Sequence, residues 1–472
     1  MKNILLIEPN YPNKYPPLGL LKIGTYHKLK GDNVHFFKGC IKVNNVAWDR
    51  IYITTLFSFY HDKTIETILH YKSLLKGNIK KIFIGGIYAT LEPNVIYNAT
   101  GIYPHVGLID KPGILGDDDI IIDTLIPDYD LLSKSEYDYS LLDSYFGYAT
   151  RGCPNKCKFC AVRKLEPCFK DYINLKEYVN QIKLHYGEKQ NLILFDNNIL
   201  ASSEFKRIIN DIKDLGFEKG SKLNNRQRIV DFNQGIDARL INNDNANDLS
   251  EICIKPIRIA FDDIRYEKVY KKAIITVSNK ELLNLSNYIL YNYEDKPNEF
   301  YTRLKINVEL NNQLGTKIYS FPMRYTPLNY INRSYVGKHW NKRQIRGIQC
   351  ILNVTKGIVG PKYDFFLEAF GYDINEFNRI ILMPEEYIIN RFKYKENRSR
   401  DWHKQYKSLT ENQRCEFISI IADNNNEIIE DAYIQTKSIK IKKLLSHYLY
   451  SRDIIKSNRG KDFEDYRFIE AI

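Results

Sequence analysis

Three cysteines close together constrain this chain more than any other feature of its sequence. Cys153, Cys157 and Cys160 have the spacing CxxxCxxC and directly follow a strand-like run. A zinc site would need a fourth ligand nearby, but Cys168 is eight residues further on and no histidine lies between. Three thiolates on a four-iron cluster leave one iron free to chelate the amino and carboxylate groups of an amino-acid cofactor. The motif therefore predicts a reactive iron-sulfur site.

The segment around these cysteines resembles the radical S-adenosylmethionine superfamily, whose hallmark is CxxxCxxC on the loop after the first strand of a barrel. The superfamily has an aromatic residue before the last cysteine, and Phe159 stands at that position. The resemblance, over roughly residues 1–325, implies a [4Fe-4S] cluster on the three cysteines with S-adenosylmethionine on the open iron. It implies reductive cleavage to methionine and a 5′-deoxyadenosyl radical, with flavodoxin or ferredoxin as reductant. A structural zinc site or an electron-transfer cluster is the alternative.

The first part of the chain, residues 1–110, has the pattern of an α/β, doubly wound (Rossmann-like) domain. Strand-like runs alternate with helical stretches, as in a parallel sheet. The runs occupy residues 3–7, 50–54 and 81–84. Pro16-Pro17-Leu18-Gly19-Leu20 and Gly85-Gly86 resemble the cobalamin-binding-like domain that precedes the barrel in one branch of the superfamily. The two glycines allow close approach of a ligand, although a tight turn explains them equally well.

The sequence leaves cobalamin binding open. The string Asp-x-His-x-x-Gly that accompanies cobalt ligation is missing from residues 1–110, and His27, His35 and His61 lack its context. Some members of the superfamily bind cobalamin without that histidine. Methylthiotransferases bring a second cluster from three N-terminal cysteines, whereas this region has only Cys40, so that branch is disfavoured.

Residues 145–325 predict a partial TIM-type (β/α)6 barrel, joined to the first domain by a linker with short elements at 111–144. Six strand-like runs alternate with helical segments, and the site of such a barrel lies where its strands end. The runs are 146–150, 192–196, 229–232, 257–261, 288–291 and 317–321.

Polar residues follow several of these strands. Helix capping explains each of them singly, but their repetition argues for a shared site. The resemblance implies that the second strand end faces the methionine moiety, the third and fourth strand ends face the ribose or the substrate, and the last strand packs on adenine. The expected catalytic residues are Asp196, Gln234 and Asp237, and the expected cofactor-binding residues are Phe159, Asn197, Asn198, Asp262, Phe321 and Met323.

Residues 326–472 predict a helical, basic C-terminal domain. The net charge of +12 favours a polyanionic partner, although the Lys, Asn, Ile and Tyr content also fits an AT-rich genome. Cations and aromatics mix in 391–407 and 335–343, as phosphate contacts with base stacking would require. The expected phosphate contacts are Arg391, Lys393, Lys395, Arg398 and Arg400. A solvated helix face is the alternative interpretation.

Composition points to a cytoplasmic protein. Eight cysteines with one tight cluster do not form a disulfide framework, and no apolar run approaches the roughly 18 residues of a membrane span. Ile4–Ile7 is an expected first strand and not a secretory signal. Cys350 and Cys415 stand 65 residues apart, which disfavours an auxiliary cluster.

Taken together, these features predict a radical S-adenosylmethionine enzyme that modifies an unidentified substrate, for which a nucleic acid or nucleotide is one candidate class. One alternative is a non-catalytic, regulatory iron-sulfur protein that binds a partner. Another is a cobalamin-dependent radical methyltransferase that acts on a small molecule or peptide.

Overall fold

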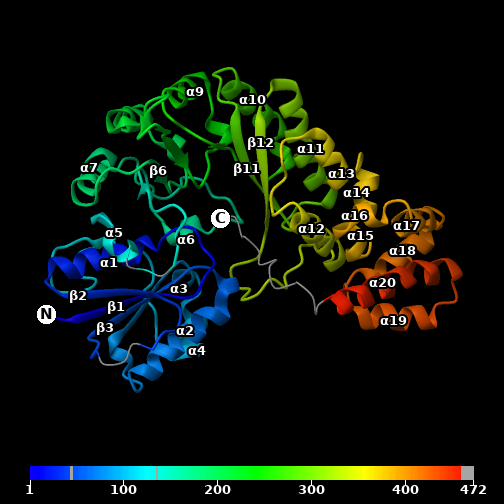
Figure 1. Ribbon diagram of the computed structural model, residues 1–472, viewed down its shortest axis with the longest axis horizontal. Coiled ribbons are helices and arrows are strands. Elements are labelled where there is room, and N and C mark those ends of the chain that lie inside the picture. The colour runs from blue at the N-terminus through cyan, green and yellow to red at the C-terminus, as the bar shows by residue number, and fades with distance from the viewer. Residues whose placement is uncertain (43–45, 134, 136, 459–472) are drawn as a thin grey trace.

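The computed structural model describes residues 1–42, 46–133, 135 and 137–458. The expected C-terminal domain extends past this part of the chain, since 459–472 lie outside the described residues. Figure 1 shows a mixed α/β protein, with an N-terminal sheet in blue, strands and helices in cyan and green, and C-terminal helices in yellow to red. No helix in the described ranges combines the length and apolar character that crossing a membrane requires.

A four-stranded parallel sheet in the order β2-β1-β3-β4 forms the N-terminal part. Its strands are β1 (Asn3–Glu8), β2 (Asn33–Lys38), β3 (Arg50–Thr55) and β4 (Ile82–Gly86), and its helices are α1 (Leu18–Leu29), α2 (His61–Leu74), α3 (Ile87–Leu91) and α4 (Pro93–Thr100). Side chains of β1 alternate between the faces, because Leu5 packs with residues of α2 whereas Leu6 packs with residues of α1. Both faces are therefore buried, as in a doubly wound sheet.

The expected linker packs against the α1 face of this sheet. It contains a short 3-10 helix, Ile122–Thr124, and α5 (Tyr129–Ser133). Ile122 and Leu131 belong to the same buried cluster as Leu20 of α1. The buried Lys22 ammonium donates to the backbone carbonyl of Asp123 at 2.5 Å. This segment is thus part of the N-terminal core.

Six parallel strands alternate with helices in the next part of the chain, which we call the six-strand region (residues 144–324). The strands are β5 (Ser144–Gly147), β6 (Asn191–Leu194), β9 (Ile229–Phe232), β10 (Ile257–Arg258), β11 (Asn284–Tyr291) and β12 (Lys317–Arg324). The helices are α6 (Val162–Leu165), α7 (Leu175–Tyr186), α8 (Phe205–Ile212), α9 (Asn243–Ser250), α10 (Glu267–Ser278) and α11 (Pro297–Leu314), and β7 (Lys222–Leu223) and β8 (Arg226–Gln227) form a small antiparallel ribbon.

The strands of this region form two three-stranded parallel sheets, β5-β6-β9 and β10-β11-β12. Single parallel bridges join Val230 to Ile254 and Ile236 to Ile259, and one hydrophobic core spans both sheets. All pairings within the two sheets and the bridges between them are parallel, so the carboxyl ends of the six strands lie on one side. The continuous partial barrel remains a prediction.

The C-terminal part consists of helices in the described residues. They are α12 (Lys342–Val354), α13 (Tyr363–Phe370), α14 (Ile374–Ile380), α15 (Glu385–Ile389), α16 (Arg391–Tyr394), α17 (Arg398–Lys407), α18 (Glu411–Ile421), α19 (Asn426–Gln435) and α20 (Ile439–Asn458). They pack on α11, because Phe300 and Tyr301 share a core with Phe366 and Phe377. The helices α19 and α20 are separate, since the hydroxyl groups of Thr436 and Ser438 accept local backbone hydrogen bonds between them.

Candidate functional site

The three motif cysteines lie on one loop between β5 and α6. Backbone hydrogen bonds in both directions between Arg151 and Lys170 close this loop, at 3.1 and 2.9 Å. Gly152 precedes the first cysteine with φ of +73°, and a Cβ there would lie 2.6 Å from the carbonyl oxygen of Cys168. Only glycine fits this turn without a shift of the backbone. The loop is therefore held in shape on both sides of the motif. We call it the cysteine loop (residues 151–170).

The thiols of the cysteine loop lie close enough to influence one another. Cys153 and Cys157 are half-buried, and Cys160 is exposed. Burial raises the pKa of Cys157, with Arg239 opposing and Cys153 adding to the rise. Burial also raises the pKa of Cys160, and Cys157 and Cys153 add to it. Ligation of a metal would thus release protons from these thiols.

No three His, Cys, Asp or Glu side chains within the described ranges are arranged to bind a single metal ion. A [4Fe-4S] cluster on the three thiols of the cysteine loop remains a prediction.

Hydrogen bonds connect the residues after β6 to the cysteine loop and to the two residues just before it. The buried Asp196 carboxylate accepts hydrogen bonds from the backbone N–H of Ala149 at 3.0 Å and from Thr150 Oγ1 at 2.7 Å, and also from the Thr150 N–H. Asn198 Nδ2 donates to Cys153 Sγ at 3.6 Å. The expected second strand end thus lies beside the first motif cysteine.

Two features of this strand end bear on ligand binding: the hydrogen bonds of Asn197 and the unpartnered oxygen of Asn198. Asn197 Nδ2 donates to Glu166 Oε2 at 2.8 Å, and that carboxylate also accepts the Gly152 N–H at 2.6 Å. Asn198 Oδ1 is buried and has no hydrogen-bond partner among the described residues. A buried acceptor without a partner costs free energy, which a bound donor such as an ammonium group would recover.

Asp196 gives the protein a testable pH dependence. Burial raises its pKa to about 6 from the ordinary 3.8. The folded protein therefore holds this proton more tightly than the unfolded chain, so stability falls as pH rises through the window between these values. In Asp196→Asn this pH-dependent loss should disappear. The free energy of unfolding of the variant, relative to that of the wild type, should therefore be about 3 kcal/mol higher at pH 7 than at pH 3.5.

Urea denaturation of both proteins at the two pH values measures this difference. The substitution also removes hydrogen bonds, but the resulting loss of stability is the same at both pH values and cancels when the two pH dependences are compared. Parallel pH dependences in the two proteins would show that Asp196 titrates normally.

The third strand end also reaches the cysteine loop. Asn155 Nδ2 donates to Asp237 Oδ2 at 2.9 Å, and Arg239 forms an ion pair with the same carboxylate at 2.6 Å. Although burial opposes it, hydrogen bonds from Arg239 and Asn155 lower the pKa of Asp237. Asp237 also accepts the Arg239 N–H, which is the helix-capping contact considered as the alternative. Gln234 is exposed and donates to Asn233 Oδ1 at 3.1 Å. Catalytic roles for Asp237 and Gln234 remain predictions.

The remaining expected residues belong to the second sheet or contact it. Asp262 follows β10 and accepts the Leu290 N–H at 3.3 Å, and burial raises its pKa to about 6. Phe159 meets the ring of Tyr293, which follows β11, with 5.7 Å between centroids. Phe321 and Met323 are half-buried on β12. Their contact with adenine remains a prediction.

Tyr15 was not expected from the sequence. It belongs to the segment after β1, yet its hydroxyl accepts a hydrogen bond from Asn233 Nδ2 at 2.6 Å at the end of β9. Its ring meets Phe195 edge-on, with 5.4 Å between centroids. Tyr288 of β11 donates to the carbonyl of Asn233 at 3.1 Å. The N-terminal part therefore contributes a side chain to the end of the six-strand region.

A buried network around Arg303 supports the fourth strand end. Arg303 of α11 is fully buried and donates to the carbonyls of Phe261 and Asp262 at 3.1 and 2.8 Å. It also forms an ion pair with Asp295 at 2.7 Å. Trp340 Nε1 donates to the Asp295 carbonyl at 2.8 Å. The chain leading into the C-terminal helices is thereby linked to Asp262.

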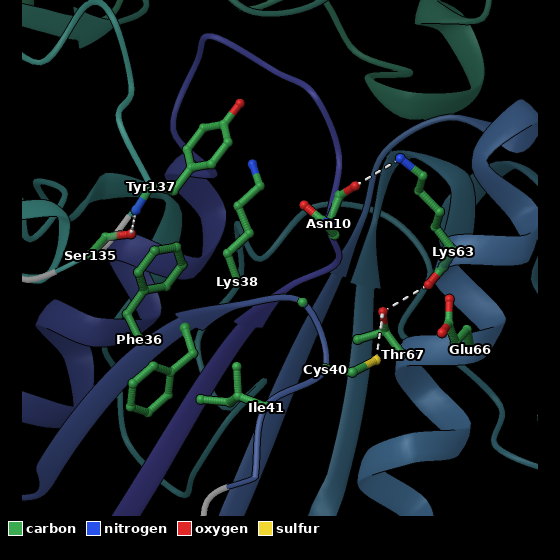
Figure 2. A pocket seen from close by; sticks show the side chains of 12 residues that line it. Asn10, Phe36, Lys38, Cys40, Ile41, Lys63, Glu66, Thr67, Ser135 and Tyr137 are labelled. Carbon is green, nitrogen blue, oxygen red and sulfur yellow. Dashed lines mark hydrogen bonds between the residues drawn. The ribbon is translucent and has the colours of Figure 1, made fainter. Parts of the chain in front are cut away.

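A separate cavity of about 560 Å³ opens beside the N-terminal sheet, where β1 and β2 end (Figure 2). Lys63 Nζ donates to the Asn10 carbonyl at 3.0 Å on one side. On the other, Lys38 pairs with the buried Glu8 at 3.0 Å and lies over the ring of Tyr137 at 3.5 Å. Its described lining includes no residue of the cysteine loop.

Comparisons with known proteins found a likeness to solved structures. No protein-family model matches the sequence, and no curated protein matches it. The apo, selenomethionine-labelled structure of OxsB, a cobalamin-dependent S-adenosylmethionine radical enzyme, is similar with 11% identity and a TM-score of 0.44. The match covers 99% of this chain and 82% of that one. At this identity and TM-score the likeness assigns no function to this chain, so the proposal rests on the site.

Proposed function

We propose that this protein is a radical S-adenosylmethionine enzyme that binds a [4Fe-4S] cluster through Cys153, Cys157 and Cys160. The observation that carries the proposal is the gathering of three thiols on one loop after β5, with the amide of Asn198 on the sulfur of Cys153. Three protein thiolates leave one iron of such a cluster for a cofactor.

The residues around the cysteine loop fit this cofactor. The buried, unpartnered Asn198 Oδ1 suits an ammonium donor such as the one in the methionine moiety. Asp196 and Gly152 hold the two strand ends and the loop in fixed positions. When bound, cluster and S-adenosylmethionine supply a 5′-deoxyadenosyl radical, and the protein positions the substrate and excludes water.

Hydrogen bonds already engage two of the histidines of the N-terminal part, His27 and His61, which disfavours them as cobalt ligands. Both ring nitrogens of His27 are engaged, with Asp32 at 2.8 Å and Tyr52 at 2.9 Å. His61 Nδ1 contacts the hydroxyl of Tyr88 at 2.8 Å. A Cβ on Gly86 would lie 2.4 Å from the Thr55 carbonyl oxygen, so this glycine serves a tight turn. We derive no step through cobalamin.

The net charge of +12 favours an anionic substrate, a nucleic acid or nucleotide. Electrons would come from a protein such as flavodoxin or ferredoxin. Cleavage of S-adenosylmethionine can be tested without the substrate and without the protein electron donor, because a chemical reductant can replace that donor.

The test is anaerobic incubation of the reconstituted protein with S-adenosylmethionine and dithionite. We expect 5′-deoxyadenosine and methionine in equal amounts, formed slowly without substrate, as measured by liquid chromatography and mass spectrometry. An intact cluster with a competent reductant and no deoxyadenosine would instead support a regulatory iron-sulfur protein.

A further inference from the structure

Four largely buried charges of alternating sign join the N-terminal part to the cysteine loop. They are Lys22 of α1, Asp123 of the linker, Arg151 at the start of the cysteine loop and Glu166 after α6, and we call them the bridging network. Asp123 pairs with Lys22 at 3.2 Å and with Arg151 at 3.7 Å, and Arg151 pairs with Glu166 at 3.1 Å. The loop also meets the N-terminal part at α6, which lies beside α3 (Figure 1).

Arg151 connects the two halves of the bridging network. Its side chain is buried, and its guanidinium lies over the ring of Tyr148 at 4.0 Å. Its terminal nitrogen Nη2 forms ion pairs with both Asp123 and Glu166. The backbone of Arg151 is in turn paired with that of Lys170 at the other end of the loop. Arg151 therefore fixes where the linker lies relative to the start of the cysteine loop.

Glu166 joins the cysteine loop to the end of β6. Its Oε1 takes part in the ion pair with the guanidinium, whereas its Oε2 accepts hydrogen bonds from the Gly152 N–H at 2.6 Å and from Asn197 Nδ2 at 2.8 Å. The next residue, Asn198, donates to Cys153 Sγ and carries the unpartnered Oδ1. One carboxylate thus fixes the position of the first motif cysteine relative to the acceptor that we assign to the cofactor.

The contacts of Glu166 require a carboxylate, because both of its oxygens accept. A glutamine has one acceptor oxygen and one donor amide nitrogen at the same two positions. In Glu166→Gln the amide nitrogen would have to face either the Arg151 guanidinium or the donors of Gly152 and Asn197. Either arrangement places donor against donor, so one side of the connection is lost.

We propose that Glu166 is a positioning residue for S-adenosylmethionine and that Arg151 and Asp123 hold it in place from the N-terminal part. Without its carboxylate the cysteine loop can shift relative to Asn198. Binding of the ammonium group at Asn198 and chelation at the open iron would then no longer coincide in one pose. The inference deepens the proposed function by assigning residues that orient its cofactor, and it rests on that function for the identity of the cofactor.

The test compares Glu166→Gln and Asp123→Asn with the matched control Asp110→Asn. Asp110 also pairs with a cation of the cysteine loop, Lys170 at 3.5 Å, but Lys170 is 47% exposed, so water screens that pair. Titration of the reduced, iron-loaded proteins with S-adenosylmethionine, followed by electron paramagnetic resonance, gives the dissociation constant. It should rise about 10- to 100-fold in Glu166→Gln, and in the same direction in Asp123→Asn, with iron content retained. Asp110→Asn should bind like the wild type.

Two further measurements separate positioning from a contribution to stability alone. The double variant Asp123→Asn/Glu166→Gln should bind S-adenosylmethionine no more weakly than Glu166→Gln, because Asp123 acts through the same carboxylate. In the iron-free proteins, hydrogen exchange followed by mass spectrometry should show faster exchange of the amides of residues 152–160 in Glu166→Gln and Asp123→Asn, but not in Asp110→Asn.

Equal dissociation constants in Glu166→Gln and the wild type, or an equal rise in Asp110→Asn, would overturn the proposal. Lower stability in urea with normal cofactor binding would mean that the bridging network only stabilises the fold. Additive losses in the double variant would overturn the role of Asp123. If Glu166→Gln fails to fold, Asp123→Asn replaces it, since Lys22 there keeps its hydrogen bond to the backbone carbonyl at 2.5 Å.

Failure of the proposed function gives a different result. Wild-type protein that binds no S-adenosylmethionine would contradict that function. The exchange measurement on the iron-free proteins would still decide whether the bridging network holds the cysteine loop, and equal exchange in all variants would overturn the inference by itself.

Discussion

Replacing Cys157 by alanine is expected to remove nearly all iron from the anaerobically reconstituted protein and to abolish formation of 5′-deoxyadenosine. Two remaining thiolates do not hold a four-iron cluster that three thiolates bind. Iron content, visible absorption and the electron paramagnetic resonance of the reduced protein measure the first effect. Liquid chromatography measures the second.

Cys168→Ala is the matched control. Cys168 is exposed and lies in the same loop, but its backbone and not its thiol meets Gly152. We expect this variant to keep its iron and its activity. A Cys157→Ala protein with full iron, together with loss of iron from Cys168→Ala or from a variant of the buried Cys253, would show that the cluster assignment is wrong.

The strands of the N-terminal sheet were predictable where they are buried. The runs at 3–7 and 50–54 appear as the central strands β1 and β3, which are apolar because both of their faces are buried, and the run at 81–84 overlaps the edge strand β4. The strand β2 gave no such pattern. It lies at the edge of the sheet, where Phe36 is its one fully buried residue. With one well-packed side chain, the sequence of β2 resembles a loop, whereas the other edge strand, β4, buries both Ile82 and Ile84.

The surroundings of the site residues were less predictable than their identity. Cysteine spacing places three thiols on one loop, which is a local property of the sequence. By contrast, Asp196 binds Thr150, 46 residues away, and Tyr15 binds Asn233, 218 residues away. Such contacts depend on how strands and domains pack, and neither residue type nor periodicity encodes them. The orphan acceptor of Asn198 likewise emerges only from the fold, whereas the capping contact of Asp237 with Arg239 is local and was the alternative considered from the sequence.

The largest expected loss of stability comes from Arg303→Met. Methionine preserves much of the side-chain volume but removes the charge, so Asp295 would be left buried without its partner. Breaking one side of a buried ion pair typically costs about 3–5 kcal/mol, and the carbonyls of Phe261 and Asp262 would also lose their donor. Urea denaturation followed by tryptophan fluorescence measures the change, since Trp340 lies in the same network.

Arg265→Met is the matched control, because Arg265 pairs with Asp263 at 2.5 Å but is 80% exposed. Water and salt screen such a surface pair, so its removal should change stability little. Arg303→Met should still bind iron, since the cysteine loop belongs to the other sheet, whereas a shift of Asp262 should lower the rate of deoxyadenosine formation. Equal effects of the two arginine variants on stability would mean that the Arg303 network does not anchor the C-terminal helices to the fourth strand end. Loss of iron from Arg303→Met would mean that the two sheets are coupled more tightly than their single bridges indicate.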